Sequence, residues 1–257
     1  MPFIMTSPGN ALITGAARRI GHAIALALAR DGWNIAVHCH RSRLEADATA
    51  RELSGLGVTA AVVEGDLSQV DTAAALMAES TRRLGPIRCL VNNASEFAFD
   101  DLASLDVDQW DRQMAVNLRA PVWLAREFAR RLPQDASGCV INLLDQKVFN
   151  LNPDFLSYTL AKVALQGATQ TLAMALAPRI RVCAVAPGIT LLSGEQSEEN
   201  FRRAHAEAPL GKSSSEEDVA EAVRFLVRSS SITGETLLVD GGQHLWSRRR
   251  DVQFNPS

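Results

Sequence analysis

The sequence predicts an α/β fold in which about seven parallel strands form one doubly wound sheet with helices on both faces. Short apolar runs alternate with longer helical patterns along most of the chain, which is typical of parallel crossover units. The 257 residues, 47% of them hydrophobic, can bury one large core, and no linker, repeat or low-complexity segment divides them. We therefore expect a single domain over residues 1–257, with a core from about 11 to 242 and a tail of residues 243–257.

The N-terminal half contains four strand-like runs, each followed by a helical pattern. The first run is short and apolar and ends in a glycine, and the helix after it has small or apolar residues on most faces. The second helix is amphipathic. Pro121 lies inside the last helix of this half, so we expect a kink or a local break there. The predicted strands are residues 11–14, 34–40, 58–64 and 88–92, and the predicted helices are residues 20–30, 43–56, 70–84 and 107–132.

The C-terminal half continues this alternation. Strands at 139–143 and 180–186 flank a helix at 155–177, and a helix at 216–227 precedes the last strand at 235–239. Three consecutive arginines at 248–250 form a charge run, which is more often a solvated chain end than a binding patch.

Composition argues against several classes of partner and location. A net charge of −3 gives no reason to expect nucleic acid or an anionic membrane as a partner. The four cysteines are scattered through strand-like runs, which favours core packing in a reducing compartment over a zinc site. The first six residues lack the features of a signal peptide, and no apolar run approaches the length of a bilayer span. We expect a soluble, cytoplasmic protein.

Tyr158 and Lys162 are the first candidates for chemistry. Residues four apart lie on one face of a helix, with Cβ atoms about 5–6 Å apart. An ammonium beside a phenol favours the phenolate, so we expect Lys162 to lower the pKa of Tyr158 from about 10 towards working pH. Tyr158 is the only tyrosine of the chain. The alternative is an ordinary half-buried aromatic residue beside a solvated lysine.

A glycine loop after the first strand is the candidate cofactor site. Gly15 and Gly21 lie between the first strand and the first helix, where the chain can approach a pyrophosphate closely, although a simple strand–helix turn is the alternative. The second strand ends without the acidic residue of NAD-specific folds. Arg18, Arg41 and Ser42 offer charge and hydrogen-bond donors to a 2′-phosphate instead, which predicts NADPH/NADP⁺ as the cofactor.

With these pieces placed, the chain resembles the short-chain dehydrogenase/reductase family from about residue 11 to residue 242. The matching motifs are Thr14-Gly15 to Gly21, Asp66, Asn92-Asn93-Ala94, Asn117, Tyr158-x-x-x-Lys162, Pro187-Gly188 and Val239-Asp240-Gly241-Gly242.

The resemblance implies a Rossmann-like fold and a homotetramer built on the helices 107–132 and 155–177. It implies that Tyr158 is the proton donor and that Lys162 binds the nicotinamide ribose and lowers the pKa of Tyr158. Asn117 would help to hold a water chain to Lys162, and Asp66 would cap the adenine.

Two departures from the family pattern concern the substrate. Asp145 stands thirteen residues before the tyrosine, where the family normally has a serine, and Ser95 stands where glycine is usual. A serine hydroxyl donates to a carbonyl oxygen, whereas an ionised carboxylate cannot donate and would repel an oxyanion. Asp145 therefore argues for reduction of a C=N bond in a nitrogen heterocycle. The alternative is a degraded site in which Asp145 is tolerated.

These departures are similar to those of pteridine reductases and bacterial dihydromonapterin reductases, often labelled alternative dihydrofolate reductases. That resemblance implies that Phe97 stacks on the pterin, and that Arg19 and Ser95 contact the pterin or the cofactor phosphates. It also implies that residues 189–211 form the substrate loop. It assigns no role to Glu96.

The predicted site has three parts and no metal ligand. The predicted catalytic residues are Tyr158, Lys162, Asp145 and Asn117. The predicted cofactor-binding residues are Gly15, Arg18, Arg19, Ile20, Gly21, His40, Arg41, Ser42, Asp66, Leu67, Asn92, Asn93, Ala94, Ser95, Tyr158, Lys162, Pro187, Gly188 and Ile189. The predicted substrate-binding residues are Arg19, Ser95, Phe97, Asp145, Tyr158 and Leu191.

We predict an NADPH-dependent reductase of a small-molecule pterin or folate. Hydride would reach the carbon of a C=N bond, and a proton would reach the nitrogen through Tyr158 or through a water held by Asp145. One alternative is a carbonyl reductase of the same family acting on a 3-oxoacyl or sugar/polyol substrate. A second is a non-catalytic NADP(H)-binding regulator, against which the presence of Tyr158, Lys162 and Asn117 together argues.

Overall fold

Seven parallel strands form one sheet in the order β3-β2-β1-β4-β5-β6-β7, which confirms the predicted fold class. The structure is a computed structural model that describes residues 8–192 and 197–254. Three segments lie outside this description: residues 1–7, expected not to be a signal peptide, residues 193–196 of the expected substrate loop, and residues 255–257.

The elements follow the predicted order, with one helix added and one divided. The strands are β1 (Asn10–Ile13), β2 (Asn34–Cys39), β3 (Ala60–Glu64), β4 (Ile87–Asn92), β5 (Gly138–Leu143), β6 (Ile180–Pro187) and β7 (Thr236–Val239). The helices are α1 (Arg19–Arg30), α2 (Arg43–Gly55), α3 (Thr72–Leu84), α4 (Val107–Met114), α5 (Ala120–Arg131), α6 (Leu156–Leu176), α7 (Glu198–Ala206) and α8 (Glu216–Arg228).

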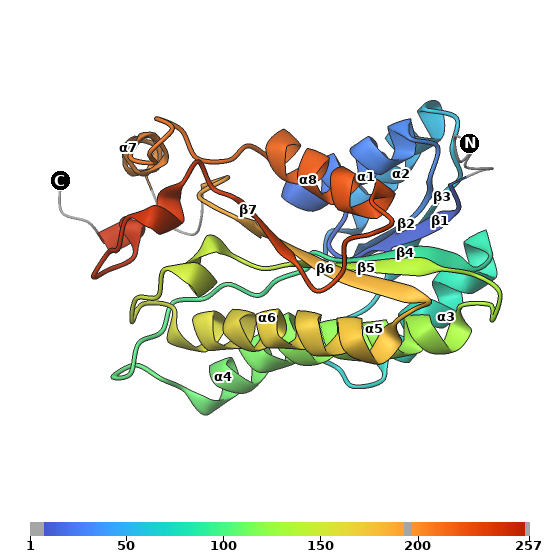
Figure 1. The fold of residues 1–257 in the computed structure, drawn as a ribbon, viewed down its shortest axis with the longest axis horizontal. Helices are drawn as coiled ribbons and strands as arrows, with labels where there is room; N and C mark the ends of the chain where they lie inside the picture. Colours follow the sequence, from blue (N-terminus) through green and yellow to red (C-terminus); the bar gives the residue numbers. More distant parts are fainter. Residues whose placement is uncertain (1–7, 193–196, 255–257) are drawn as a thin grey trace.

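Two layers of helices cover the sheet. Figure 1 shows α1, α2 and α8 on one face and α3, α4, α5 and α6 on the other. Helix α7 and the red C-terminal segment lie together at the end of the molecule where α6 begins. The arrangement follows from strand alternation: in β1, Ala11 and Ile13 pack on the α1 side, whereas Leu12 packs on the opposite side.

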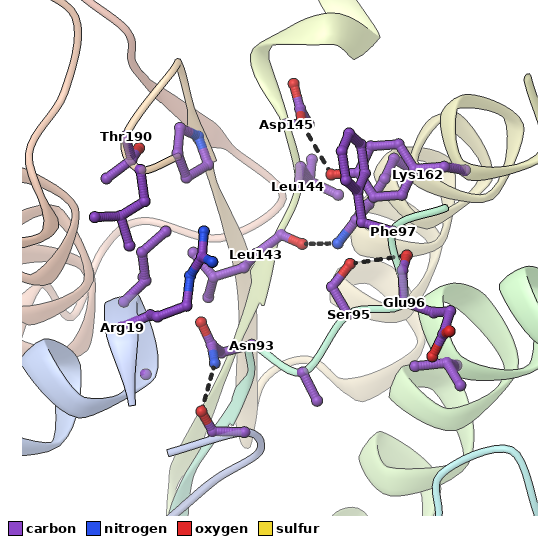
Figure 2. A pocket seen from close by; sticks show the side chains of 18 of the residues that line it. Arg19, Asn93, Ser95, Glu96, Phe97, Leu143, Leu144, Asp145, Lys162 and Thr190 are labelled. Atoms are coloured by element: carbon purple, nitrogen blue, oxygen red, sulfur yellow. Dashed lines mark hydrogen bonds between the residues drawn. The ribbon is translucent and has the colours of Figure 1, made fainter. Parts of the chain in front are cut away.

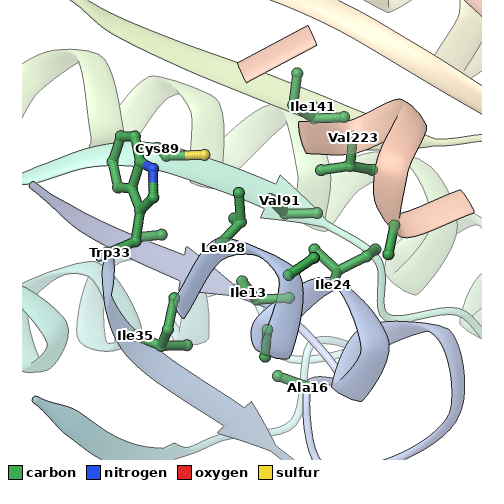
Figure 3. Close-up of a cluster of buried hydrophobic side chains, with 14 of the residues drawn as sticks. Ile13, Ala16, Ile24, Leu28, Trp33, Ile35, Cys89, Val91, Ile141 and Val223 are labelled. Carbon is green, nitrogen blue, oxygen red and sulfur yellow. The ribbon is translucent and has the colours of Figure 1, made fainter. Parts of the chain in front are cut away.

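The core on the α1 side is made of aliphatic side chains from several strands and helices. Ile24 and Leu28 of α1 pack against Val91 of β4, and Val223 of α8 packs in the same cluster (Figure 3). The four cysteines are buried and free, which confirms that they are core residues: Cys39, Cys89, Cys139 and Cys183. No helix in the described part of the chain is both long and apolar enough to span a membrane.

The predicted helix 107–132 is interrupted just before Pro121. In a regular α-helix the carbonyl of Asn117 would accept the N–H of residue 121, and proline has none. A π-helical turn at Ala115–Arg119 takes up the mismatch, and the N–H of Ala120 donates to the carbonyl of Ala115. Pro121 then lies in the first turn of α5. The expected local break is confirmed, and it falls at Asn117 itself.

Helix α7 lies within the predicted substrate loop, where no helix was expected. The hydroxyl of Ser197 accepts the backbone N–H of Asn200 at 3.1 Å and caps its start, and Glu198 and Glu199 occupy its first turn. Ser followed by acidic residues is a helix-start signal that sequence reasoning could have used.

Candidate active site

A cavity of about 700 Å³ opens at the carboxyl ends of the strands. Its walls come from the segments that follow β1 to β6 and from the C-terminal tail. Strands β2 and β3 are added on one side of β1, and β4 to β7 on the other, so the strand order reverses between β1 and β4. Doubly wound sheets bind ligands in the crevice at such a switch point.

The glycine loop is held tightly against the start of the β4 loop. The Asn93 side-chain amide donates to the Thr14 carbonyl at 2.8 Å, and the backbone N–H groups of Asn93 and Ala94 donate to the Thr14 hydroxyl, each at 2.9 Å. A β-carbon at Gly21 would collide with the Gly15 carbonyl oxygen, so only glycine fits there. The loop therefore keeps its backbone exposed along one wall of the cavity.

Arg19 occupies this loop with an unusual backbone. Its φ is 57°, in the left-handed region, which costs a non-glycine residue about 1–2 kcal/mol. Its Nη2 donates to the Leu192 carbonyl at 3.0 Å, and Figure 2 shows its side chain reaching across the cavity below Thr190. The side chain therefore links the glycine loop to the segment after β6.

His38 at the end of β2 is a residue that sequence reasoning missed. Its Nδ1 accepts the backbone N–H of Gly15 at 3.1 Å, and its Nε2 lies 3.0 Å from the Gly65 carbonyl. This pattern needs the neutral ring protonated on Nε2. Burial lowers the pKa of His38 to about 4, so the ring stays neutral and joins the β1 and β3 loops.

The predicted 2′-phosphate residues line the cavity at the β2 end. Arg18 and Arg41 are exposed, and Ser42 is half-buried beside them. His40 lies 3.8 Å from Asp66, whose carboxylate accepts the backbone N–H of Ser68 at 2.9 Å. The cavity thus brings the predicted cationic groups and the predicted adenine-side aspartate to the same end.

Tyr158 and Asp145 meet at the other end of the cavity. The Tyr158 hydroxyl donates to Oδ2 of Asp145 at 2.9 Å, the bond that the dashed line at Asp145 marks in Figure 2. Oδ1 of Asp145 accepts the backbone N–H of Lys147 at 2.8 Å. Burial, reinforced by the Asp145 carboxylate, raises the pKa of Tyr158 well above its usual value. Burial also raises the pKa of Asp145. Tyr158 is therefore a protonated donor facing an acceptor.

Lys162 lies on the same face of α6, as expected, but its ammonium contacts a carbonyl. Its Nζ donates to the Leu143 carbonyl at 2.7 Å and lies 5.6 Å from the centre of the Tyr158 ring. Burial lowers the pKa of Lys162 to about 8. The expectation that the pKa of Tyr158 is lowered is wrong for this geometry, because burial and then the Asp145 carboxylate, which accepts the hydroxyl, both oppose ionisation.

Asn117 sits behind the cavity wall rather than on it. Its Oδ1 accepts the Ser95 hydroxyl at 2.8 Å, and its Nδ2 donates to Gln113 at 2.8 Å and to the Glu96 carbonyl at 2.9 Å. The Glu96 carboxylate lies 3.2 Å from Nε of Arg112. Asn117 thus holds the loop after β4 against the π-helical turn, and its expected role in a water chain stays a prediction.

Phe97 presents its ring beside Tyr158. The rings of Phe97 and Phe155 are stacked, with centroids 4.3 Å apart, and the Phe97 ring meets Tyr158 edge-on at 4.8 Å. Phe97 keeps 40% of its surface exposed, and it lines the cavity. A flat ring ligand could contact it there.

Comparison with known proteins places this geometry in a family. Residues 15–244 match a family model described as "Enoyl-(Acyl carrier protein) reductase". The "Short-chain dehydrogenase/reductase eriH" of Hericium erinaceus is 34% identical over 254 residues, with 93% of this chain and 99% of that protein covered. The chain belongs to the short-chain dehydrogenase/reductase family.

Other similar proteins carry different descriptions. The 3-oxoacyl-[acyl-carrier-protein] reductase FabG of Staphylococcus aureus (strain Mu50 / ATCC 700699) is 31% identical, with 92% of this chain and 98% of that protein covered. One similar solved structure is the FolM alternative dihydrofolate reductase 1 of Brucella canis, complexed with NADP. It is 46% identical to this chain with a TM-score of 0.91, and the match covers 95% of this chain and 97% of the other. A blue fluorescent protein from a metagenomic library, in complex with NADPH, is 30% identical with a TM-score of 0.85, covering 91% and 97%.

Most residues predicted for the site of this short-chain dehydrogenase/reductase line the cavity, but two do not. Asn117 is one. The other is Asn92, whose buried amide donates to Asn142 at 2.8 Å and so joins β4 to β5 below the cavity floor. Placing Asn92 on the cavity wall is wrong, because successive residues of a strand face opposite sides. The roles of the other predicted residues stay predictions.

The tail contributes cavity residues that the sequence did not indicate. Arg248, Arg250, Asp251 and Val252 all line the cavity, so this part of the tail is more than a solvated chain end, although Arg249 and Arg250 are exposed as expected. Lys147, a buried lysine two residues after Asp145, was also missed. Its rarity as one of three lysines was the available signal.

Proposed function

We propose that this protein is an NADPH-dependent reductase of dihydropterins or dihydrofolate. The observation that carries the proposal is the half-buried Asp145 carboxylate, which accepts the Tyr158 hydroxyl at 2.9 Å where the family normally has a serine donor. An acceptor suits a C=N bond that gains a proton and opposes a carbonyl oxygen that gains negative charge. The likeness to the Brucella canis dihydrofolate reductase supports the same reaction.

The residues at the β2 end fit the cofactor. The glycine loop suits a pyrophosphate because its backbone is exposed to the cavity. Glycine is needed at position 21 for this tight turn, since a side chain there would collide with the Gly15 carbonyl oxygen. Arg18, Arg41 and Ser42 would hold the 2′-phosphate. When bound, NADPH supplies a hydride from C4 of its nicotinamide. Lys162 would bind the nicotinamide ribose hydroxyls.

Tyr158 and Asp145 would handle the proton. Because burial and Asp145 keep the Tyr158 phenol protonated, its Oη holds a proton at working pH. That proton, or one on a water held by Asp145, would pass to the ring nitrogen as the carbon is reduced. The Asp145 carboxylate would stabilise positive charge that develops on the C=N bond, and Phe97 would contact the face of the pterin.

A carbonyl reductase acting on a 3-oxoacyl or sugar/polyol substrate is the second candidate. The 31% identity to FabG over nearly the full length of both chains favours it. In that case Tyr158 alone would donate to the developing oxyanion, with Asp145 nearby opposing it.

The test is NADPH oxidation with dihydromonapterin, dihydrobiopterin, dihydrofolate and a 3-oxoacyl thioester measured side by side. We expect a higher kcat/KM for a dihydropterin or dihydrofolate than for the thioester. A thioester preference would overturn the proposal in favour of the second candidate. No turnover of any of the substrates, with NADPH still bound, would favour a binding protein.

We also propose a homotetramer built on the helices α4, α5 and α6. These helices expose large apolar side chains away from the sheet, among them Trp123, Leu160 and Met174, the last with 74% of its surface accessible. Light scattering after gel filtration measures the mass directly. A monomer at micromolar concentration would contradict this proposal.

A further inference from the structure

The C-terminal segment from Arg248 to Phe254, here called the strap, crosses the substrate end of the cavity. The turn after β7 aims it there: the buried Asp240 carboxylate accepts the backbone N–H groups of Gly242 and His244 at 2.9 and 2.8 Å. Farther along, the Asn150 amide donates to the Trp246 carbonyl at 2.9 Å. The strap therefore reaches the cavity through a fixed path rather than as a loose chain end.

Two adjacent strap residues of opposite charge match two buried anchors of opposite charge. Arg250 contacts the Asp154 carboxylate through Nε and Nη2, at 2.9 and 2.8 Å. The Asp251 carboxylate lies 2.8 Å from Nζ of Lys147. The anchors Asp154 and Lys147 are 1% and 3% exposed. A buried charge without a partner is strongly unfavourable, so docking of the strap satisfies both anchors at once.

Both anchors are coupled to the groups proposed for catalysis. The backbone N–H of Lys147 donates to Asp145, so the anchor for Asp251 also fixes the carboxylate that faces Tyr158. Asp154 immediately precedes Phe155, the residue with a left-handed backbone (φ 54°) that caps the start of α6. The strap is thus joined to the two segments that place Asp145 and Tyr158.

Aromatic packing continues the connection to the substrate face. The Phe254 ring of the strap lies edge-on to Phe99, with centroids 5.0 Å apart, and 6.1 Å from Phe155. Phe155 in turn stacks on Phe97 at 4.3 Å. The strap therefore buttresses the ring that is proposed to contact the substrate.

We propose that the strap determines substrate selectivity by forming the wall of the cavity beyond Asp145, held by the Arg250–Asp154 and Asp251–Lys147 ion pairs. Arg250 and Asp251 pair with their anchors, and Arg248, which also lines the cavity, pairs with Glu207 at 2.6 Å, so the charged strap residues that line the cavity all have partners of opposite charge. The wall therefore offers mainly shape and hydrogen bonds. It limits the size of the substituent carried by the reduced ring. This proposal rests on the cavity being the active site proposed above.

The test compares Arg250→Gln, Asp251→Asn and a chain ending at residue 247 with the matched control Arg249→Gln. Arg249 is exposed, lies beside Arg250 and does not line the cavity. Dihydromonapterin and dihydrofolate provide a small and a large substituent, and NADPH affinity is measured separately. In Arg250→Gln and Asp251→Asn we expect KM for the small substrate to rise about tenfold, as for a lost charged hydrogen bond. We expect the Kd of NADPH to stay near wild type, and the ratio of the two kcat/KM values to shift towards dihydrofolate.

The outcomes separate the strap from the proposed function. A wild-type ratio of the two kcat/KM values in both point variants overturns the proposal. A loss of NADPH affinity as large as the rise in KM also overturns it, because it would indicate a general structural role. The point variants decide the matter if the shortened chain does not fold. If wild-type enzyme reduces no pterin, the proposed function fails. The role of the strap is then tested by the ratio of kcat/KM for a short and a long 3-oxoacyl thioester.

Discussion

Replacing Asp145 by asparagine tests the polarity of the proposed site. Both oxygens of Asp145 act as acceptors, one from the Tyr158 hydroxyl at 2.9 Å and one from the Lys147 N–H at 2.8 Å. Asparagine has the same shape but only one acceptor oxygen. If that oxygen still accepts the Lys147 N–H, the side-chain NH₂ of the asparagine faces Tyr158. The hydrogen bond between the two side chains is then reversed, with the amide as donor and the Tyr158 hydroxyl oxygen as acceptor. The substitution thus removes the negative charge and turns the Tyr158 hydroxyl proton away from residue 145.

The magnitude follows from the kind of bond that is lost. A hydrogen bond to a charged group contributes about 1.5–3 kcal/mol. If that energy stabilises the transition state, kcat/KM for a dihydropterin should fall about 10- to 150-fold in Asp145→Asn. Asp145→Ser should weaken dihydropterin reduction as well, and it should raise activity on simple ketones because it restores a hydroxyl donor.

The assay is steady-state NADPH oxidation with the best dihydropterin and with one 3-oxoacyl substrate, for wild type and both variants. Asp31→Asn is a suitable control, because Asp31 pairs with Arg224 between α1 and α8 and does not line the cavity. A wild-type kcat/KM for the dihydropterin in Asp145→Asn would refute the reasoning. Circular dichroism of each variant checks that the fold is kept.

Three further predictions concern the cofactor, the proton and pH. NADPH should bind about 10- to 100-fold more tightly than NADH, as expected for a charged contact to the 2′-phosphate. In fluorescence titrations Arg41→Asp should reverse this order, and equal Kd values of the two cofactors in wild type would contradict the prediction. Tyr158→Phe should lower kcat by about 10²- to 10⁴-fold with nearly unchanged NADPH affinity, and near-wild-type turnover would mean that the proton comes from elsewhere. Burial lowers the pKa of His38 from 6.5 to about 4, so between those pH values the unfolded chain binds a proton that the folded chain does not. The free energy of unfolding should therefore lose roughly 3 kcal/mol from this group as the pH falls from 6.5 to 4, with no effect above 6.5. Urea unfolding of His38→Gln should lack this part of the pH dependence, and an unchanged slope would rule out the assignment.

The sequence determined the parallel sheet and the main groups of the site, because these depend on local patterns. Alternation of strands and helices predicted the seven-stranded sheet, and its order in the structure confirms the fold class. Helical spacing predicted that Tyr158 and Lys162 share a face of α6. The proline rule predicted the break that the structure places at Asn117, just before Pro121.

Tertiary structure decided the electrostatics, because the charges involved are distant along the chain. The sequence predicted that Lys162 would lower the pKa of Tyr158, but Lys162 donates to the Leu143 carbonyl and Asp145 takes the hydroxyl. The side chain of His38 joins two loops that the sequence does not show to be neighbours. Burial, which sets the direction of all these pKa shifts, exists only once the chain has folded.

The C-terminal strap shows the same limit most clearly. In the sequence, the arginines at 248–250 form a charge run like that of many solvated chain ends. In the structure, Arg250 and Asp251 pair with Asp154 and Lys147, about a hundred residues earlier in the chain. No periodicity or motif links such distant positions, because the complementarity arises from where the sheet and α6 place the anchors. The sequence therefore identified the glycine loop, Asp145 and the Tyr158–Lys162 pair, and the tertiary structure decided which of these groups face one another and which tail residues join them in the cavity.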